Sequence, residues 1–169
     1  MTTDVTNLES MEVLVPAARV AEYHGASATE SSAISAAVGA ALRTIQTFLI
    51  VNRISAAGPP RVVYGEWSPA GVKFTVAVPI GDVPPDVEKS PDVSITTTAE
   101  CSALRFVHRG PYRDVRHTYD RIESWLRARG GIKTAADWAR YAPMWEEYLN
   151  DPATTPESDL VTRIYLTLR

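Results

Sequence analysis

The chain has 169 residues, of which 45% are hydrophobic and 22% charged, which is the composition of an ordinary globular protein. Its net charge of -3 and sequence pI of about 5.6 argue against DNA or RNA as the main partner, because nucleic-acid binders usually carry a basic patch and a pI above about 9. Cys101 is the single cysteine, so an intramolecular disulfide and a thiolate-rich metal site are excluded and a reducing setting is indicated.

The N-terminus lacks the basic start and apolar stretch of a signal peptide. We expect that no stretch of the sequence approaches the roughly 18 apolar residues that a membrane-spanning helix needs. We therefore expect a cytoplasmic protein without a membrane partner. At roughly 100–200 residues per domain, we expect residues 1–169 to form a single domain.

The first half of the chain predicts one strand, one helix and two further strands. Residues 11–24 alternate in their second half, which indicates a strand broken or bulged at Pro16. Apolar residues then recur at helical spacing and predict a helix that ends before Gly58: Ile34, Val38, Leu42, Ile45 and Leu49. Residues 61–67 and 71–80 are rich in β-branched and aromatic side chains and predict two strands joined by a turn.

The second half predicts the same order after a proline-rich linker at residues 83–91. Residues 93–108 form a long extended run. One helical face follows and ends at Gly130-Gly131, marked by Val115, Tyr119, Ile122 and Leu126. Residues 141–149 and the alternating run 160–168 complete this half.

These two halves predict an α+β fold built from two strand-helix-strand-strand repeats, at about 11–82 and 92–169. The repeat is also visible in residues, because His24 and Gly25 precede the first helix much as His108 and Gly110 precede the second. We expect antiparallel sheets with the helices packed on them and a pseudo-twofold axis relating the repeats. A groove between the repeats would then be a natural ligand site.

Three motifs in the second half resemble those of a known family. The first is His-x-Gly-Pro-Tyr at 108–112, the second is aromatic-Glu-x-Tyr-Leu-Asn at 145–150, and the third is Pro-Glu-x-x-Leu-x-Thr-x-Ile-Tyr at 156–165. The chain resembles the GyrI-like small-molecule-binding family, which is related to the effector-binding domains of AraC-type and MerR-type transcription regulators. The resemblance covers nearly the whole chain and is strongest from Leu104 onward.

The resemblance implies a duplicated fold whose pocket is lined by aromatic side chains around one glutamate and takes lipophilic, often cationic, compounds. Some free-standing members of the family hydrolyse reactive cyclopropane-bearing antibiotics. The family glutamate falls on Glu146, whereas Glu147 stands where the family usually has an apolar residue. The chain has no room for a helix-turn-helix domain, which implies a free-standing member.

Glu146 and Glu147 should point to opposite faces of a strand, so at most one of them can enter a pocket and the other should be solvated. The family match and the aromatic neighbours favour Glu146, although both could be surface charges or ion-pair partners of nearby arginines. In an apolar pocket, desolvation would raise the pKa of the Glu146 carboxyl, and a cationic ligand would oppose that shift. Such a group suits both cation binding and general acid or base chemistry.

Aromatic rings beside this carboxylate would add cation–π attraction worth on the order of 0.5–2 kcal/mol each. The candidate ligand-binding rings are Tyr64, Trp67, Tyr112, Trp138, Tyr141 and Tyr148. For any one of them ordinary core packing is an open alternative, and we expect Trp125 to lie in the core.

Other patterns give no site. His24 and His108 lack a third ligand at a recognisable spacing, so we expect no metal and no cofactor, and we predict that both histidines bond backbone groups at strand-to-helix corners. The arginines around the second helix alternate with Asp114, Asp120 and Glu123, which indicates a salt-bridged, solvated face. Nucleophile-elbow, phosphate-loop and metalloprotease motifs are missing from the sequence.

Three hypotheses follow. In the first, the protein binds a lipophilic, possibly cationic small molecule through Glu146 and surrounding tyrosines and tryptophans. In the second, the same pocket hydrolyses an electrophilic small molecule, with Glu146 directing water and Tyr148 orienting or protonating the substrate. The third, less favoured, is a protein-interaction role of the gyrase-inhibitor type.

Overall fold

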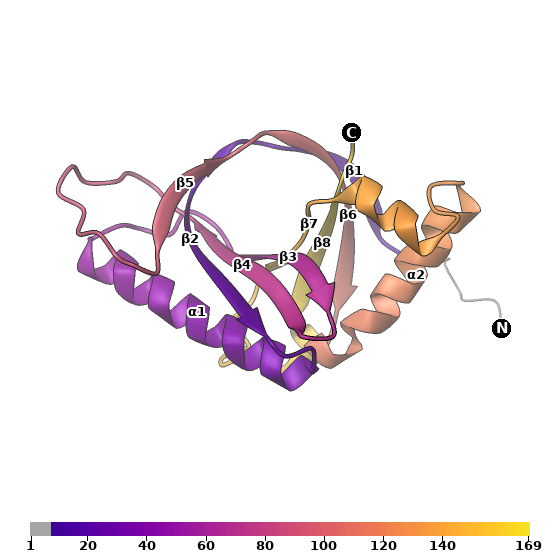
Figure 1. Cartoon of the computed structure of the whole chain (residues 1–169), viewed down its shortest axis with the longest axis horizontal. Helices are drawn as coiled ribbons and strands as arrows, with labels where there is room; N and C mark the ends of the chain where they lie inside the picture. The colour runs from indigo at the N-terminus through magenta and orange to yellow at the C-terminus, as the bar shows by residue number, and fades with distance from the viewer. Residues whose placement is uncertain (1–7) are drawn as a thin grey trace. The chain divides into compact units, whose positions relative to one another are not determined.

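The computed structural model describes residues 8–169 and contains two compact units, each with one longer helix and a set of antiparallel strands (Figure 1). The central unit comprises Pro16–Glu100, and the C-terminal unit comprises residues 8–15 together with Cys101–Arg169. Residues 1–7, on which the signal-peptide prediction rests, lie outside the described part of the chain. The α+β class is confirmed.

The central unit has the strand order β3-β4-β2-β5, and all of its pairings are antiparallel. Its elements are β2 (Ala18–Ser27), α1 (Ser31–Val51), β3 (Arg61–Ser68), β4 (Gly71–Pro79) and β5 (Ser94–Thr98). The helix α1 packs against β2 and β4 and buries Ala41, Ile45, Phe48 and Leu49. Residues 81–93, which include the predicted linker, contain no helix or strand.

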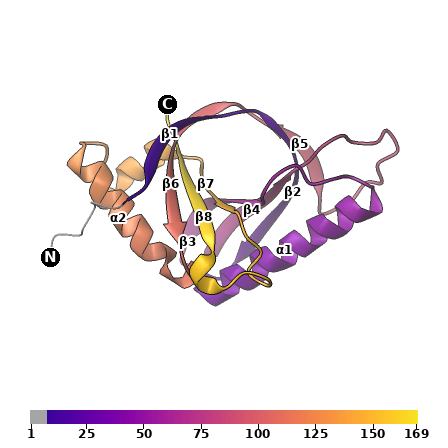
Figure 2. The same ribbon diagram turned by 180° about the vertical axis from the view of Figure 1, so that it is seen from behind.

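The C-terminal unit has the strand order β1-β6-β8-β7, so β8 lies between β6 and β7 (Figure 2). Its elements are β1 (Ser10–Val15), β6 (Cys101–Arg109), α2 (Val115–Ala128), β7 (Met144–Tyr148) and β8 (Val161–Thr167). Three short 3-10 turns lie between them, at Tyr112–Asp114, Ala135–Tyr141 and Glu157–Asp159. Each unit therefore contains the predicted order strand, helix, strand, strand. The predicted pseudo-twofold axis and groove stay predictions.

Two strands, β1 and β5, lie in a different unit from the one to which the predicted repeats at 11–82 and 92–169 assign them. The predicted strand at 11–24 is two strands separated by Pro16, and β1 pairs with β6 from Ser10 opposite Phe106 to Val15 opposite Cys101. The predicted run at 93–108 is likewise two strands, and β5 pairs with β2 of the central unit. Proline has no N–H for a ladder, which explains the first break.

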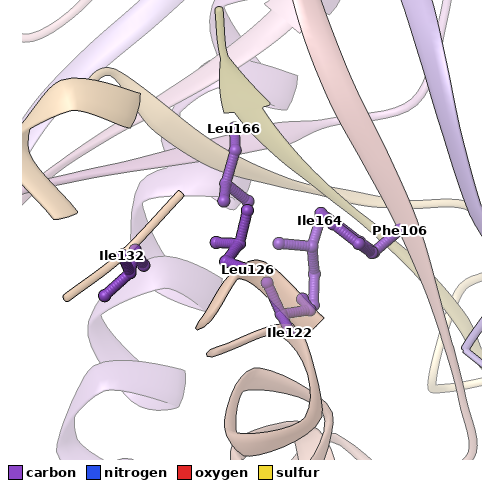
Figure 3. Close-up of a cluster of buried hydrophobic side chains, with 6 residues drawn as sticks. All are labelled: Phe106, Ile122, Leu126, Ile132, Ile164 and Leu166. Atoms are coloured by element: carbon purple, nitrogen blue, oxygen red, sulfur yellow. The ribbon is translucent and has the colours of Figure 1, made fainter. Parts of the chain in front are cut away.

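The core of the C-terminal unit lies between α2 and one face of the sheet (Figure 3). It joins Phe106 of β6, Ile122 and Leu126 of α2, Ile132, and Ile164 and Leu166 of β8. Burying each such side chain contributes roughly 1.5–3 kcal/mol. The helix ends as predicted, because Gly130 adopts a positive φ of 72° that an L side chain rarely adopts.

The helix α1 contradicts the expectation that no stretch of the sequence is long and apolar enough to span a membrane. Within residues 8–169 it is the single helix long and apolar enough to cross a membrane, with a mean hydropathy of 1.6 and Arg43 as its only charged residue. The core helix of a soluble protein can pass the same test of length and composition, so this observation assigns no location.

Candidate functional site

The register of β7 decides which way its two glutamates point. Glu146 lies opposite Ile164, a residue of the core under α2, whereas Glu147 lies opposite Arg163. Because successive side chains of a strand alternate between faces, Glu146 points toward α2 and Glu147 points away from it. The predicted division of the pair between two faces is confirmed.

Glu146 is only 5% exposed and is held by two phenols. The hydroxyl of Tyr119, from α2, donates to its Oε1 at 2.9 Å, and the hydroxyl of Tyr148 donates to its Oε2 at 2.7 Å. Burial raises the pKa of the Glu146 carboxyl, while the hydrogen bonds from Tyr148 and Tyr119 and the nearby His108 oppose that shift. The result is a buried acid that is costly to ionise without a cationic partner.

Tyr112 adds a second aromatic layer to this group. It comes from the 3-10 turn before α2, and its ring meets the ring of Tyr148 edge-on at a centroid distance of 5.2 Å. The pKa of the Tyr112 phenol is raised by burial and then by the negative charges of Asp151 and Glu146. Tyr112 thus lies within the electrostatic reach of both carboxylates.

His108 is buried beneath the first turns of α2, at 4% exposure. Its Nε2 lies 3.0 Å from the carbonyl oxygen of Pro111 and its Nδ1 lies 2.7 Å from the hydroxyl of Thr118. A carbonyl can only accept, so Nε2 carries a proton and donates it. The prediction that this histidine bonds backbone at a strand-to-helix corner is confirmed.

His24, its predicted counterpart in the central unit, makes different contacts. Its Nδ1 lies 2.9 Å from the Thr75 hydroxyl and its Nε2 lies 3.5 Å from a carboxylate oxygen of Glu22. These partners are side chains, so the backbone-bonding prediction is wrong for His24, which lies on a strand rather than at the strand's end. Within residues 8–169 no group of three or more histidine, cysteine or acidic side chains could hold a metal ion.

Glu147 is also 5% exposed, so the prediction that the second carboxylate is solvated is wrong. Its Oε2 accepts a hydrogen bond from the Tyr165 hydroxyl at 2.9 Å and a contact from Arg163 Nη1 at 3.4 Å. The ring of Trp145 stacks on Tyr165 with centroids 4.8 Å apart and planes 6° from parallel. The strand β7 therefore carries a buried acid with aromatic neighbours on each face.

The other four predicted ring residues form two pairs, one in each unit. Trp138 and Tyr141 form an edge-on pair at 6.5 Å and pack against the core cluster of the C-terminal unit. Tyr64 and Trp67 belong to the central unit, with ring centroids 6.0 Å apart, and Trp67 is 55% exposed. Within the C-terminal unit, Tyr148 bonds Glu146 directly and the ring of Tyr112 packs against that of Tyr148.

Each unit contains a cavity. A cavity of about 280 Å³ in the C-terminal unit is lined by His108, Thr118 and several charged side chains. A more open cavity of about 550 Å³ in the central unit is lined by residues of β2, β3 and β4 that include His24 and Phe74. Neither cavity is lined by Glu146.

Comparisons with known proteins place the chain in context. The family model described as the GyrI-like small molecule binding domain matches residues 68–169. No curated protein matches the chain.

Several solved structures share the fold at low sequence identity. The chain aligns with the EcmrR C-terminal domain at a TM-score of 0.75 and 14% identity, covering 96% of this chain and 98% of that one. The chain also aligns with EcmrR in its DNA complex at a TM-score of 0.75 and 13% identity. This alignment covers 94% of this chain and 56% of the EcmrR chain.

Two further structures are similar over most of their length. One is SAV2435 bound to tetraphenylphosphonium, with a TM-score of 0.61, 15% identity and coverage of 95% of this chain and 94% of that one. The other is a hydrolase from Listeria innocua, with a TM-score of 0.60, 16% identity and coverage of 94% and 90%. These likenesses show the fold.

Proposed function

This chain belongs to the GyrI-like small-molecule-binding family, and from that premise we propose that it holds a lipophilic cation against Glu146. The observation that carries the proposal is the Glu146 carboxylate itself, which is 5% exposed and held by the Tyr119 and Tyr148 hydroxyls. A buried carboxylate is expensive to ionise unless a cation compensates it. A lipophilic cation provides that charge at a low desolvation cost.

The surrounding phenols suit a ligand of this kind. The rings of Tyr148 and Tyr112 lie edge to face with centroids 5.2 Å apart, so both could contact the same bound cation. Each well-placed ring contributes roughly 0.5–2 kcal/mol to the binding of a desolvated cation. We place the entrance on the side of Tyr112 and Asp151, because both Tyr112 and Tyr148 are half-buried and Asp151 is exposed there. Asp151 would be the outer negative charge that the cation meets first.

Tetraphenylphosphonium is the natural probe, because SAV2435, whose fold is similar, is bound to it. The test measures its affinity by isothermal titration calorimetry for the wild-type protein and for Glu146→Gln, which keeps the shape of the side chain and removes its charge. We expect Glu146→Gln to bind about 10- to 100-fold more weakly. Triphenylphosphine oxide, a neutral relative of the probe, should bind both proteins alike.

The matched control is Glu12→Gln, which neutralises an exposed carboxylate of β1 in the same unit and should leave affinity unchanged. Equal affinities for the wild-type protein and Glu146→Gln, with both folded, would sink the assignment of Glu146.

Hydrolysis is a second candidate, favoured by the 2.7 Å contact between the Tyr148 hydroxyl and Glu146. A carboxyl of raised pKa beside a phenol can pass a proton to or from an electrophilic ligand while water attacks. Incubation with a cyclopropane-bearing electrophile, followed by mass spectrometry, separates the two functions. Product formation that is lost in both Glu146→Gln and Tyr148→Phe would favour a hydrolase, and binding without product would leave a binding protein.

A further inference from the structure

Arg121 of α2 is a half-buried cation without an anionic partner among residues 8–169. Its Nε is buried and has no hydrogen-bond partner, and none of the ion pairs within the described part of the chain includes its guanidinium. Arg127, on the same helix, has Glu123 one turn before it and pairs with it at 2.6 Å. The residues three and four positions from Arg121 carry no carboxylate: His117, Thr118, Ser124 and Trp125. A guanidinium taken partly out of water is costly unless an anion compensates it.

The guanidinium of Arg121 borders the cavity of about 280 Å³ in the C-terminal unit. His117, one helical turn earlier, lines the same cavity and is exposed. Side chains four residues apart on a helix have Cβ atoms about 5–6 Å apart, so these two can contact one small ligand. An imidazole carries at least one N–H in either protonation state, so His117 can donate a hydrogen bond whether or not it is charged.

Most other polar side chains of the cavity already have partners. His108 and Thr118 lie 2.7 Å apart, atom to atom, through the imidazole Nδ1 and the hydroxyl. Glu9 pairs with Arg109 at 3.3 Å, which balances one negative charge of the cavity against one positive charge. Arg121 is therefore a cation of this cavity that its neighbours leave uncompensated.

Asp114 is the acid in the cavity lining that could oppose an incoming anion. It is exposed and precedes Arg121 by seven residues, which is roughly 10 Å along the helix axis. Exposed charges farther apart than the Debye length, about 8 Å at physiological ionic strength, are largely screened from one another. Asp114 also interacts electrostatically with the neighbouring Arg113. The end of the cavity at Arg121 is therefore positive.

We propose that this cavity binds an oxyanion, the carboxylate or phosphate group of a small molecule, through the Arg121 guanidinium. Two N–H groups of a guanidinium match two oxygens of either anion, and the hydrogen bonds are strengthened by charge. His117 contributes a further donor from the next turn of α2. Glu146 does not line this cavity, so the site is separate from the cation site proposed above.

The first test uses the wild-type protein and needs no substitution. The Nε–H signals of the arginine side chains are followed by nitrogen-15 NMR while inorganic phosphate or acetate is added, with chloride holding the ionic strength constant. The Arg121 signal should move and saturate at millimolar anion. The Arg127 signal is the internal control and should stay in place, because Glu123 already occupies that guanidinium. An Arg121 signal that does not move, or that follows total salt alone, would overturn the proposal.

The second test compares thermal unfolding of variants with and without phosphate. Phosphate stabilises folded proteins in general by its exclusion from their surface, so the informative quantity is the difference between variants. Binding should add a saturable rise in melting temperature to the wild-type protein and to Arg127→Gln, and Arg121→Gln should lose that rise. Arg121→Lys keeps the charge without the two-pronged geometry, so it should bind about 3- to 10-fold more weakly than the wild type. An equal rise in Arg121→Gln and the wild type would contradict the assignment.

The two anions identify the class of ligand. Saturation by acetate alone would support a carboxylate ligand, saturation by phosphate alone a phosphate ligand, and saturation by both a site that takes either group. Failure of both anions to bind the wild-type protein would overturn the proposal. That result would stand even if a variant of Arg121 failed to fold, because the titration is made on the unaltered chain.

Discussion

Glu146 and Glu147 are neighbours in the chain, and each is 5% exposed and accepts a phenolic hydrogen bond on its own face of the sheet. Glu146 is held by phenols from α2 and from its own strand, whereas Glu147 is held by Tyr165 of the adjacent strand. Two buried acids in succession are rare in proteins, because each must find donors before it can leave water.

Replacing Glu147 by leucine, the kind of residue usual in the family, should destabilise the protein by about 1–3 kcal/mol, because Tyr165 and Arg163 lose their acceptor. Adding Tyr165→Phe removes the orphaned hydroxyl, so the double variant should be less destabilised than the sum of the two single variants. Chemical denaturation of the four proteins measures the coupling. Strict additivity would contradict a direct Glu147–Tyr165 interaction.

Glu146→Gln should stabilise the empty protein at neutral pH. The pKa of Glu146 is raised above its ordinary value of 4.5, so its contribution to stability is fully present below pH 4.5 and is lost as the pH rises through the folded-state pKa. A glutamine cannot ionise, and its amide can still bond the two phenols. The advantage of Glu146→Gln in the free energy of unfolding should therefore grow from pH 4 to pH 8.

Denaturant titrations across that pH range measure the effect, with Glu12→Gln as the exposed control whose stability should follow the wild-type protein. A Glu146→Gln variant that is less stable than the wild type at pH 8 would show that the ionised carboxylate is well compensated in the empty protein.

Two buried threonines, Thr118 of α2 and Thr162 of β8, should respond oppositely to the same substitution. The hydroxyl of Thr162 is buried without a hydrogen-bond partner, whereas that of Thr118 lies 2.7 Å from His108 Nδ1. Thr162→Val should be neutral or stabilising by up to about 1 kcal/mol, and Thr118→Val should cost about 1 kcal/mol or more. Thermal and denaturant unfolding of both variants provides the comparison. A loss of stability in Thr162→Val would indicate that an ordered water bonds its hydroxyl.

The sequence predicts the helices and strands well, because the spacing of apolar residues indicates which face of each helix or strand is buried. This spacing predicts α2 and its end at Gly130. Strand alternation likewise predicts that Glu146 and Glu147 lie on opposite faces of the sheet. The spacing of apolar residues does not indicate which strands pair with one another at the edge of a sheet. For that reason the exchange of β1 and β5 between the units was not predicted, although Pro16 marks the break.

The site was predictable in part. Tyr148 lies two residues after Glu146, so strand geometry alone places both on one face. Tyr119 was assigned to the apolar stripe of the helix, and nothing in that stripe indicates that its hydroxyl reaches β7. Glu147 was expected to be solvated because glutamates usually are, and its burial depends on Tyr165, a residue that only tertiary structure brings beside it.

Two glycines make a final pair of opposite predictions. Gly25 of β2 lies directly opposite Phe74 of β4, and a Cβ there would come within 2.5 Å of the phenylalanine ring. Phe74 is only 4% exposed, and shifting its packed ring has a cost, so Gly25→Ala should destabilise the protein by about 1–3 kcal/mol. Gly39 lies inside α1, where a Cβ would meet nothing nearer than the flexible end of Arg43 at 3.5 Å.

Gly39→Ala should therefore stabilise the protein by about 0.5–1 kcal/mol, because alanine loses less backbone entropy in a helix than glycine does. Denaturation midpoints of the two variants test both signs in one experiment. Combining Gly25→Ala with Phe74→Leu should recover part of the loss if the clash with the ring is its cause. A double variant that loses the sum of the two single effects would instead place the cost of Gly25→Ala in the backbone of β2.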